Sequence, residues 1–393
     1  MITNMKKRKL LIGIVVLLAS CTQKNVMEET SYEANIEKVE ENLKFEDLIE
    51  SYRYIQLETT PGNRIGEIKN LVVNDKYIYV GGDDAVFCYT MEGKFNYAVK
   101  QKGHANNEYI RLSSMNVADG KLFLLDYVQG KVLVFDAEKG TYIEHYRLPY
   151  AAASVAGREG ELLIDRKQLN NTLLPNNERL FTVATENLEK PLQTFVTDKN
   201  FNSTIVGTIS PCNEGFLLTD YWNNEIIKVT HEKEFRYLKV VLDDDLKIDE
   251  EALSRAEEEG ALITKYINGT DKIGGMTNIR ECEGFIIGQL QSGMQTTLFA
   301  FDRKTTNTIA WKAKKDKVWM PNLVSIKTGY KDCFYGIQAA EDIALVKSIH
   351  NDLGEVPEEK SAREAYETYK NIKENDAPLV SVLKFKPIEN ENN

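Results

Sequence analysis

Short apolar runs separated by turn residues follow one another along most of the chain. Within residues 118–146, apolar runs at 122–125 and 132–135 are each followed by an aspartate, and a third run comes after a glycine turn. Each run has about five apolar, aromatic or β-branched residues, which is a common length for a β-strand. The breaks contain Gly, Asp and Asn, so the pattern predicts antiparallel strands joined by tight turns.

The strand pattern repeats along the chain. Residues 76–80 (KYIYV) align with residues 121–125 (KLFLL) at an offset of 45, and residues 93–95 align with residues 140–142 at an offset of 47. Counting these two, the phrase occurs six times, and its later copies lie at 160–165, 214–229, 283–302 and 331–336. A period of about 45 residues with four short strands is typical of a β-propeller blade. We therefore predict an all-β fold, a six-bladed β-propeller with four-stranded antiparallel blades, over residues 46–388.

The two ends of the repeat region predict how the ring closes. The last copy keeps only one strand after its insertion, at residues 379–385, whereas an extra strand-like run precedes the first copy, at residues 52–58. An open edge strand favours aggregation. We therefore expect residues 54–57 to form the outermost strand of the sixth blade, so that an N-terminal strand closes the last blade.

Two segments have a helical pattern instead. Residues 248–263 begin with a candidate cap, Asp249, followed by acids and good helix formers, and residues 357–375 are similar. Both lie between blade strands. We therefore predict two helical insertions that decorate the propeller, with their charged residues facing solvent.

The N-terminus has the pattern of an export signal. Basic residues at 6–9 precede a ten-residue apolar run at 10–19, which is too short to span a bilayer. The run ends in Leu-Ala-Ser-Cys, which looks like a bacterial lipobox with Cys21 as the lipid attachment residue. We predict a lipoprotein signal peptide at 1–20, with Met5 as an alternative start; a plain secretory signal is the alternative interpretation.

The segments that flank the predicted propeller are polar. Residues 21–45 are acidic without an apolar period, which predicts a flexible tether, and residues 389–393 form a short tail. Thr22 and Gln23 follow Cys21, and neither is the Asp that marks retention in the inner membrane of many Gram-negative bacteria. We therefore expect a lipid anchor, such as palmitate, in the outer membrane, on either its periplasmic or its surface face.

The charge of the chain limits its partners. The formal net charge is −11, and it would become −15 without residues 1–20, which carry four basic residues and no acids. An acidic chain without a basic stripe is a poor match for nucleic-acid phosphates. We expect no nucleic acid as a partner, contact with the membrane through the lipid on Cys21, and a monomer.

The sequence lacks the motifs of common catalytic sites. It has no H-E-x-x-H, G-x-S-x-G, P-loop or dinucleotide fingerprint, and its four histidines are scattered. The aspartates that follow apolar runs are best explained as turn residues. We predict no catalytic residue, no cofactor and no metal ligands, although several blades could still assemble a metal cluster at the central channel. The remaining cysteines are expected to be buried free thiols, with a disulfide as the alternative: Cys88, Cys212, Cys282 and Cys333.

Two loops carry candidate binding residues. The loop 102–109 connects the outer edge of one predicted blade to the inner strand of the next and offers hydrogen-bonding groups, a charge and an aromatic ring. Its candidates are His104, Asn106, Asn107, Glu108 and Tyr109. The alternative is a structural loop in which Glu108 and Tyr109 tie adjacent blades. Trp222, in a turn of the fourth blade, is a second candidate, with packing under a loop as its alternative.

Three segments resemble a known family. They are FEDLIESYRYIQLETT (45–60), IGEIKNLVVNDKYIYV (65–80) and the loop 102–109 with its Glu-Tyr pair. Over residues 45–387 the chain resembles bacterial six-bladed β-propeller lipoproteins related to NHL-repeat and TolB-like propellers. That family typically has a glycine-rich G-x-G-x-G-E-Y-like loop; here Gly103, Glu108 and Tyr109 match it, whereas residues 104–107 differ.

Export, anchoring and the lack of catalytic motifs favour a non-catalytic binding or scaffold module of the cell envelope. Its ligand could be a glycan, a peptide or a protein. The resemblance implies one alternative, a propeller hydrolase or lyase of the metal-dependent lactonase type, because related propellers can hold a metal in the channel. A purely structural assembly subunit is the third alternative.

Overall fold

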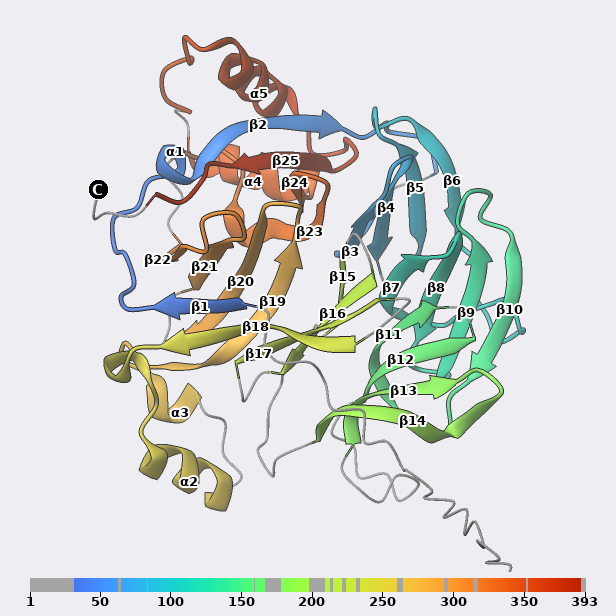
Figure 1. The fold of residues 1–393 in the computed structure, drawn as a ribbon. Helices are drawn as coiled ribbons and strands as arrows, with labels where there is room; N and C mark the ends of the chain where they lie inside the picture. Colours follow the sequence, from blue (N-terminus) through green and yellow to red (C-terminus); the bar gives the residue numbers. More distant parts are fainter. Residues whose placement is uncertain are drawn as a thin grey trace, which may run out of the picture.

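The computed structural model describes residues 32–62, 65–82, 84–158, 160–166, 178–197, 209–212, 215–220, 224–230, 234–259, 264–292, 296–313, 317–350 and 353–389. Six sheets are arranged as the blades of a ring, with the first strand of each blade at the centre (Figure 1). This confirms the predicted six-bladed β-propeller.

The first three blades follow one another along the chain. Blade one contains β3 (Ile68–Val73), β4 (Tyr77–Gly82), β5 (Val86–Thr90) and β6 (Phe95–Val99). Blade two contains β7 (Leu112–Ala118), β8 (Lys121–Asp126), β9 (Lys131–Asp136) and β10 (Tyr142–Arg147). Blade three contains β11 (Ala152–Arg158), β12 (Glu161–Arg166), β13 (Glu178–Ala184) and β14 (Asn187–Thr197).

The other three blades include strands from the N-terminal segment. Blade four contains β15 (Ile209–Cys212), β16 (Gly215–Asp220), β17 (Glu225–Val229), β18 (Glu234–Leu242) and β1 (Tyr32–Ile36). Blade five contains β19 (Ile273–Glu281), β20 (Phe285–Ser292), β21 (Thr297–Asp302) and β22 (Thr308–Lys312). Blade six contains β23 (Ile326–Tyr330), β24 (Cys333–Gln338), β25 (Leu379–Phe385) and β2 (Ile49–Gln56).

The hydrophobic core consists of layers between neighbouring blades. The middle strands are apolar on both faces: in β8 and β9, for example, residues 122–125 and 132–135 are all buried. One cluster of buried side chains lies between each pair of consecutive blades, including the pair formed by blade six and blade one. Each blade therefore depends on both neighbours for burial of its faces, as expected for a repeat architecture.

The N-terminal strand closes the ring as predicted. Strand β2 pairs antiparallel with β25, with Tyr54 opposite Ser381, and forms the outer edge of blade six. Ile55, only 5% exposed, packs into the cluster between blades six and one. Beyond the strand, the Glu58 backbone N–H donates to the Gly93 carbonyl of blade one over 2.8 Å. The first and last parts of the chain therefore share one sheet, and that sheet is bonded to the next blade.

The prediction that residues 21–45 form a flexible tether is wrong for residues 32–36. These residues form β1, which pairs parallel with β18 and makes blade four five-stranded instead of four-stranded. Ala34 and Ile36 are buried between blades four and five because alternate side chains of this short strand point into the core. Two buried side chains are too few to give an apolar period against the surrounding acids.

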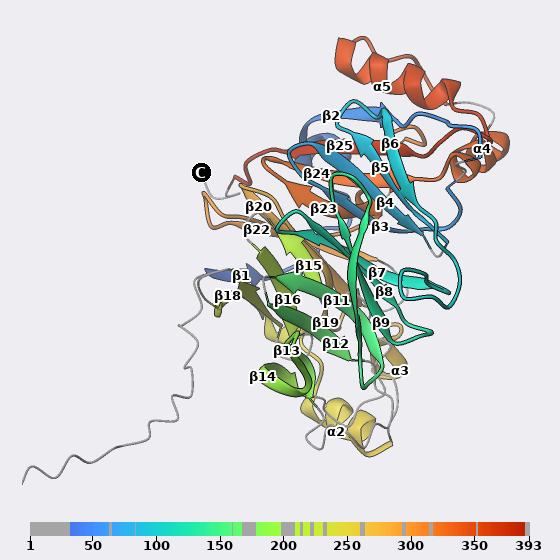
Figure 2. The same ribbon diagram turned by 90° about the vertical axis from the view of Figure 1, so that its right-hand side faces the viewer.

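The helices lie between or beside the blade strands. Both predicted insertions form, as α2 (Glu250–Glu259) and α5 (Lys360–Asn371). The other helical segments, which were not predicted, are α1 (Phe45–Leu48), α3 (Thr264–Ile267), α4 (Ala340–Ile349) and two 3-10 turns, η1 (Asp244–Leu246) and η2 (Leu323–Ser325). Helix α5 lies against the outer side of β2 (Figure 2), where the ring centroids of Tyr369 and Tyr54 are 6.3 Å apart. Within the described residues, no helix is long and apolar enough to cross a membrane.

The closing strand provides a direct test of the architecture. Ile55→Ala removes a side chain buried between blades six and one, and we expect it to lower the free energy of unfolding by about 2–4 kcal/mol. Gln56→Ala, at the adjacent exposed position of the same strand, is the matched control and should change it by no more than about 0.5 kcal/mol. Urea unfolding measures both. Equal losses in the two variants would contradict closure by β2.

Candidate functional site

The first strands of all six blades surround a central channel with a volume of about 650 Å³. Residues of β3, β7, β11, β15, β19 and β23 line it, together with Tyr127 from the turn after β8 and Arg111 just before β7. Cavities of this size hold small-molecule ligands in other proteins. The channel is therefore the candidate functional site.

A bulge recurs in four of these inner strands. The register to the second strand shifts after the first residue of β3, β7, β11 and β23. The extra residue lines the channel in every case, at Lys69, Ser113, Ala153 and Lys327. A β-bulge is one extra residue that has no partner in the neighbouring strand, and it changes the direction of the side chains around it. The four bulged positions thus determine part of the chemistry of the channel wall.

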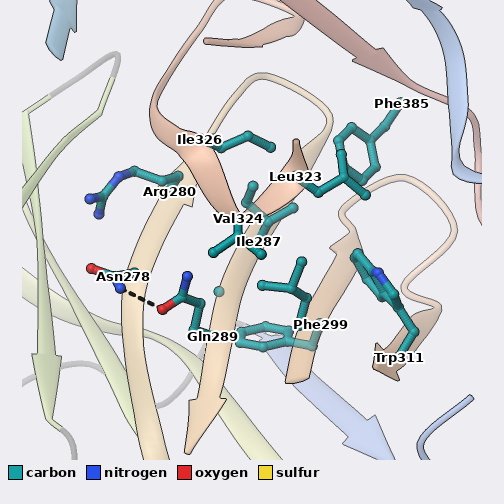
Figure 3. Close-up of a pocket in the computed structure, with 12 residues that line it drawn as sticks. Asn278, Arg280, Ile287, Gln289, Phe299, Trp311, Leu323, Val324, Ile326 and Phe385 are labelled. Atoms are coloured by element: carbon teal, nitrogen blue, oxygen red, sulfur yellow. Dashed lines mark hydrogen bonds between the residues drawn. The ribbon is translucent and has the colours of Figure 1, made fainter. Parts of the chain in front are cut away.

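Blade five has its own irregularity. The register between β19 and β20 shifts twice, and Asn278 lies at the second shift with a φ of 52°, in the left-handed region. Its Nδ2 donates to Oε1 of Gln289 over 2.6 Å (Figure 3). Arg280 follows two residues later, and its Nη1 donates to Ser210 Oγ of blade four and to the Ile279 carbonyl, both over 2.7 Å. The guanidinium plane is therefore held from one side.

The described lining is positively charged although the chain as a whole is acidic. It contains four basic residues and no Asp, Glu or His: Lys69, Arg111, Arg280 and Lys327. Burial lowers the pKa of Arg280 to about 10. Burial also lowers the pKa of Lys327, and the nearby charge of Arg280 lowers it further. A channel with basic walls concentrates anions and attracts them from solution.

Neutral polar groups complete the wall. Asn116 donates from Nδ2 to the Val155 carbonyl over 2.8 Å, but its buried Oδ1 has no partner among the described residues. The same holds for the hydroxyl of Ser154 on β11. Because buried polar groups are normally hydrogen-bonded, these two inaccessible oxygens carry a desolvation cost within the wall. The partly exposed side chains of Asn70 and Ser113 are the neutral polar groups of the lining that a ligand can contact.

A second, much smaller cavity lies behind Arg280, between blades five and six. It measures about 20 Å³, room for about one water molecule. Its wall is mostly apolar, and Figure 3 shows the Arg280 guanidinium pointing away from Phe299 and Trp311. This cavity is too small for a ligand, but Asn278 and Arg280 line both spaces, so they form the boundary between the channel and the core.

The loop 102–109 connects blades one and two as predicted. Lys131, at the start of β9, is buried, and its ammonium group donates to the carbonyls of Ala105, over 2.9 Å, and of Glu108. Tyr109 is also buried, and its hydroxyl lies 2.7 Å from the Asp84 carbonyl and 3.0 Å from that of Val99, both in or beside blade one. Tyr109 therefore ties the loop to blade one, as the structural alternative expected, and its buried ring is not exposed to a ligand.

The other candidates in this loop differ in exposure. His104, Asn106 and Asn107 are exposed, whereas Glu108 is half-buried and accepts a hydrogen bond from the Ala105 backbone over 2.9 Å. The loop leads directly into Arg111 of the channel wall. A binding role for its exposed residues stays a prediction. Trp222 and Cys21 lie outside the described residues.

The cysteines and the metal-binding residue types form no cluster in the part of the chain described above. Within the described residues no disulfide joins Cys88, Cys212, Cys282 or Cys333, and Cys88 and Cys282 are fully buried. No three His, Cys, Asp or Glu side chains within the described ranges are close enough together to hold a metal ion.

The basic residues of the channel were missed at the sequence level, although the repeat contains a signal for two of them. Lys69 and Lys327 each follow an isoleucine at the same position of the repeat, at the start of the inner strand. An alignment of the blades by inner strand, in place of the more apolar middle strands, would have placed these cations together.

The fold and the channel define this chain as a six-bladed β-propeller with a basic central channel. It belongs to the family described as domain of unknown function DUF4934, which matches residues 30–384. No curated protein matches the sequence.

One solved structure shows the same fold, and others are less similar. The crystal structure of a presumed exported protein from Bacteroides fragilis NCTC 9343 is 14% identical, with a TM-score of 0.73 over 90% of this chain and 100% of that one. BamB from Moraxella catarrhalis is 11% identical with a TM-score of 0.37, over 68% of this chain and 79% of that one. The first of these likenesses shows the shared fold.

The lowered pKa of Lys327 predicts a pH dependence of stability. In the folded protein this lysine loses its proton at a lower pH than in the unfolded chain, so the unfolded state binds more protons as the pH approaches the ordinary lysine pKa of 10.5. Wild-type stability should therefore rise relative to that of Lys327→Met between the lowered pKa and pH 10.5. Chemical unfolding at a series of pH values measures the difference, and Lys94→Met, at an exposed turn lysine, controls for the loss of one charge. A difference that does not change with pH would contradict the burial of Lys327.

Proposed function

We propose that this protein is a lipid-anchored, non-catalytic binding protein of the cell envelope, and that its ligand enters the central channel. One observation carries the proposal: inner strands of all six blades converge on a single polar channel of about 650 Å³. The neutral polar side chains of its lining that are partly exposed, such as Asn70, Ser113 and Asn278, are suited to a ligand rich in hydroxyl or amide groups. A glycan or a peptide has that chemistry.

The location in the cell envelope is supported by the sequence. The apolar run ending at Cys21 has the lipobox pattern, and the Bacteroides protein of the same fold is described as presumed to be exported. Thr22 and Gln23 favour the outer membrane. Labelled palmitate should be incorporated into the wild-type protein and not into Cys21→Ser; equal labelling of the two would contradict the anchor.

The proposed site also includes residues next to the channel wall. The loop that carries His104, Asn106 and Asn107 leads into Arg111 of the channel lining. Tyr127 also lines the channel, and the centroid of its ring is 5.9 Å from the guanidinium carbon of Arg111. We include these three exposed loop residues in the proposed binding site, together with Trp222, which lies outside the described residues. The closer kinship with NHL-repeat and TolB-like propellers, and the monomeric state, also belong to this proposal.

The alternative of a metal-dependent lactonase has no support from the channel. That chemistry needs acids, Asn or His gathered around one metal ion. The described part of the lining offers Asn70, Asn116 and Asn278 but no Asp, Glu or His. A binding function therefore agrees better with the residues present.

A plugged channel tests the proposal. Ser154→Trp places an indole in the channel at a position whose hydroxyl bonds to no described residue, whereas Ser348→Trp adds the same group at an exposed position of α4. The full chain, purified in a non-ionic detergent, would be applied to glycan and peptide arrays.

We expect the wild type and Ser348→Trp to bind the same ligand, and Ser154→Trp to bind it at least about tenfold more weakly, because the indole takes up space that the ligand needs. A tenfold loss of affinity corresponds to about 1.4 kcal/mol of binding free energy. The melting temperature of each variant shows that the protein applied to the arrays is folded. Equal binding by all three proteins would place the ligand outside the channel. Failure of the wild type to bind any glycan or peptide would also contradict the proposal.

A further inference from the structure

Two basic side chains face the channel from neighbouring inner strands. Arg280 is on β19 of blade five and Lys327 is at the bulge of β23 in blade six. They are close enough for the charge of Arg280 to affect the ionisation of Lys327. Within the described residues, neither forms an ion pair with an acid, whereas the basic residues Lys228 and Arg303 elsewhere in blades four and five are paired with Glu281.

This arrangement is unfavourable without an anion. Two like charges that have lost part of their hydration repel each other more strongly than they would in water. A buried charge is usually balanced by a charge of opposite sign, and the described channel wall supplies none. A bound anion would offset both the repulsion and the loss of hydration.

The orientation of Arg280 indicates the kind of anion. Ser210 and the Ile279 carbonyl hold Nη1, whereas Nε has no partner among the described residues and no described group accepts from Nη2. The Nε–Nη2 edge of a guanidinium matches two oxygens of one carboxylate or phosphate. Nε is buried in the wall, so we expect a ligand oxygen to contact Nη2.

We propose that the channel binds an oxyanion, the carboxylate or phosphate group of a polar ligand, between Arg280 and Lys327. This inference rests on the proposed function and names the chemical class of its ligand. Lys69 and Arg111 of the same wall add to the positive potential that draws the anion inward. The neutral groups on β7 and β11, across the channel, then contact the uncharged part of the ligand.

Thermal unfolding of the full chain in non-ionic detergent at low ionic strength tests the proposal. The probes are inorganic phosphate, acetate and an oligogalacturonate, with chloride at matched ionic strength as the control anion. We expect phosphate or a carboxylate to raise the melting temperature in a saturable way, whereas chloride does not. Stabilisation by phosphate alone would identify a phosphate group, and stabilisation by the oligogalacturonate and acetate would identify a carboxylate.

Two variants test whether the rise in melting temperature depends on Arg280 and Lys327. Arg280→Gln and Lys327→Met should each abolish the anion-dependent rise, while Lys94→Met should retain it. If Arg280→Gln fails to fold because the bond to Ser210 is lost, Lys327→Met alone decides the test. Without added anion, Lys327→Met should melt at the same temperature as the wild type or higher, because the repulsion is gone.

Two results would overturn the inference. One is that no oxyanion stabilises the wild type, and the other is that oxyanions stabilise Lys327→Met as much as the wild type. If the wild type binds a neutral array ligand that Ser154→Trp no longer binds, and oxyanions have no effect, the oxyanion inference fails while the proposed binding function stands.

Discussion

The pairing of β2 with β25 is the interaction on which the rest of the structure depends. Each blade buries both faces against its neighbours, so a ring with one incomplete blade would leave two faces and an edge strand in water. Residues from near the two ends of the described chain complete blade six, and the Glu58–Gly93 backbone bond joins that blade to blade one. Only a closed ring holds six inner strands around one channel.

Closure brings together charges that are far apart in the sequence. Lys69 and Lys327 stand more than 250 positions apart but occupy the same bulged position of the repeat, in adjacent blades one and six. Between blades four and five, Glu281 is only 2% exposed and pairs with Lys228 over 3.1 Å and Arg303 over 3.2 Å, and it also accepts from the Tyr237 hydroxyl. Removing one member of such a group would leave a buried charge, so it ties these blades together. Lys228 and Arg303 are thus neutralised by Glu281, whereas the cations of the channel wall face the space where we propose that the ligand binds.

The sequence predicted the repeat, the closing strand and two of the helices because each of these depends on local patterns of apolar and turn residues. It did not predict β1, since Ala34 and Ile36 are buried only by blades four and five and leave no apolar period of their own. Tyr109 was ambiguous for a related reason: only the fold shows that its hydroxyl reaches the carbonyls of Asp84 and Val99. The channel was missed because its residues come from six repeats, and a lone lysine at the start of a strand has no meaning until the ring places it beside Arg280.

The central claim is that ring closure builds a basic channel that holds an oxyanion. Crystals grown with arsenate, an oxyanion whose arsenic atom is located by anomalous scattering, test this claim most directly. We expect an anomalous peak inside the channel, within hydrogen-bonding distance of Arg280 Nη2 and Lys327 Nζ. Arsenate bound only on the outer surface, with the channel free of anomalous density at saturating concentration, would contradict it.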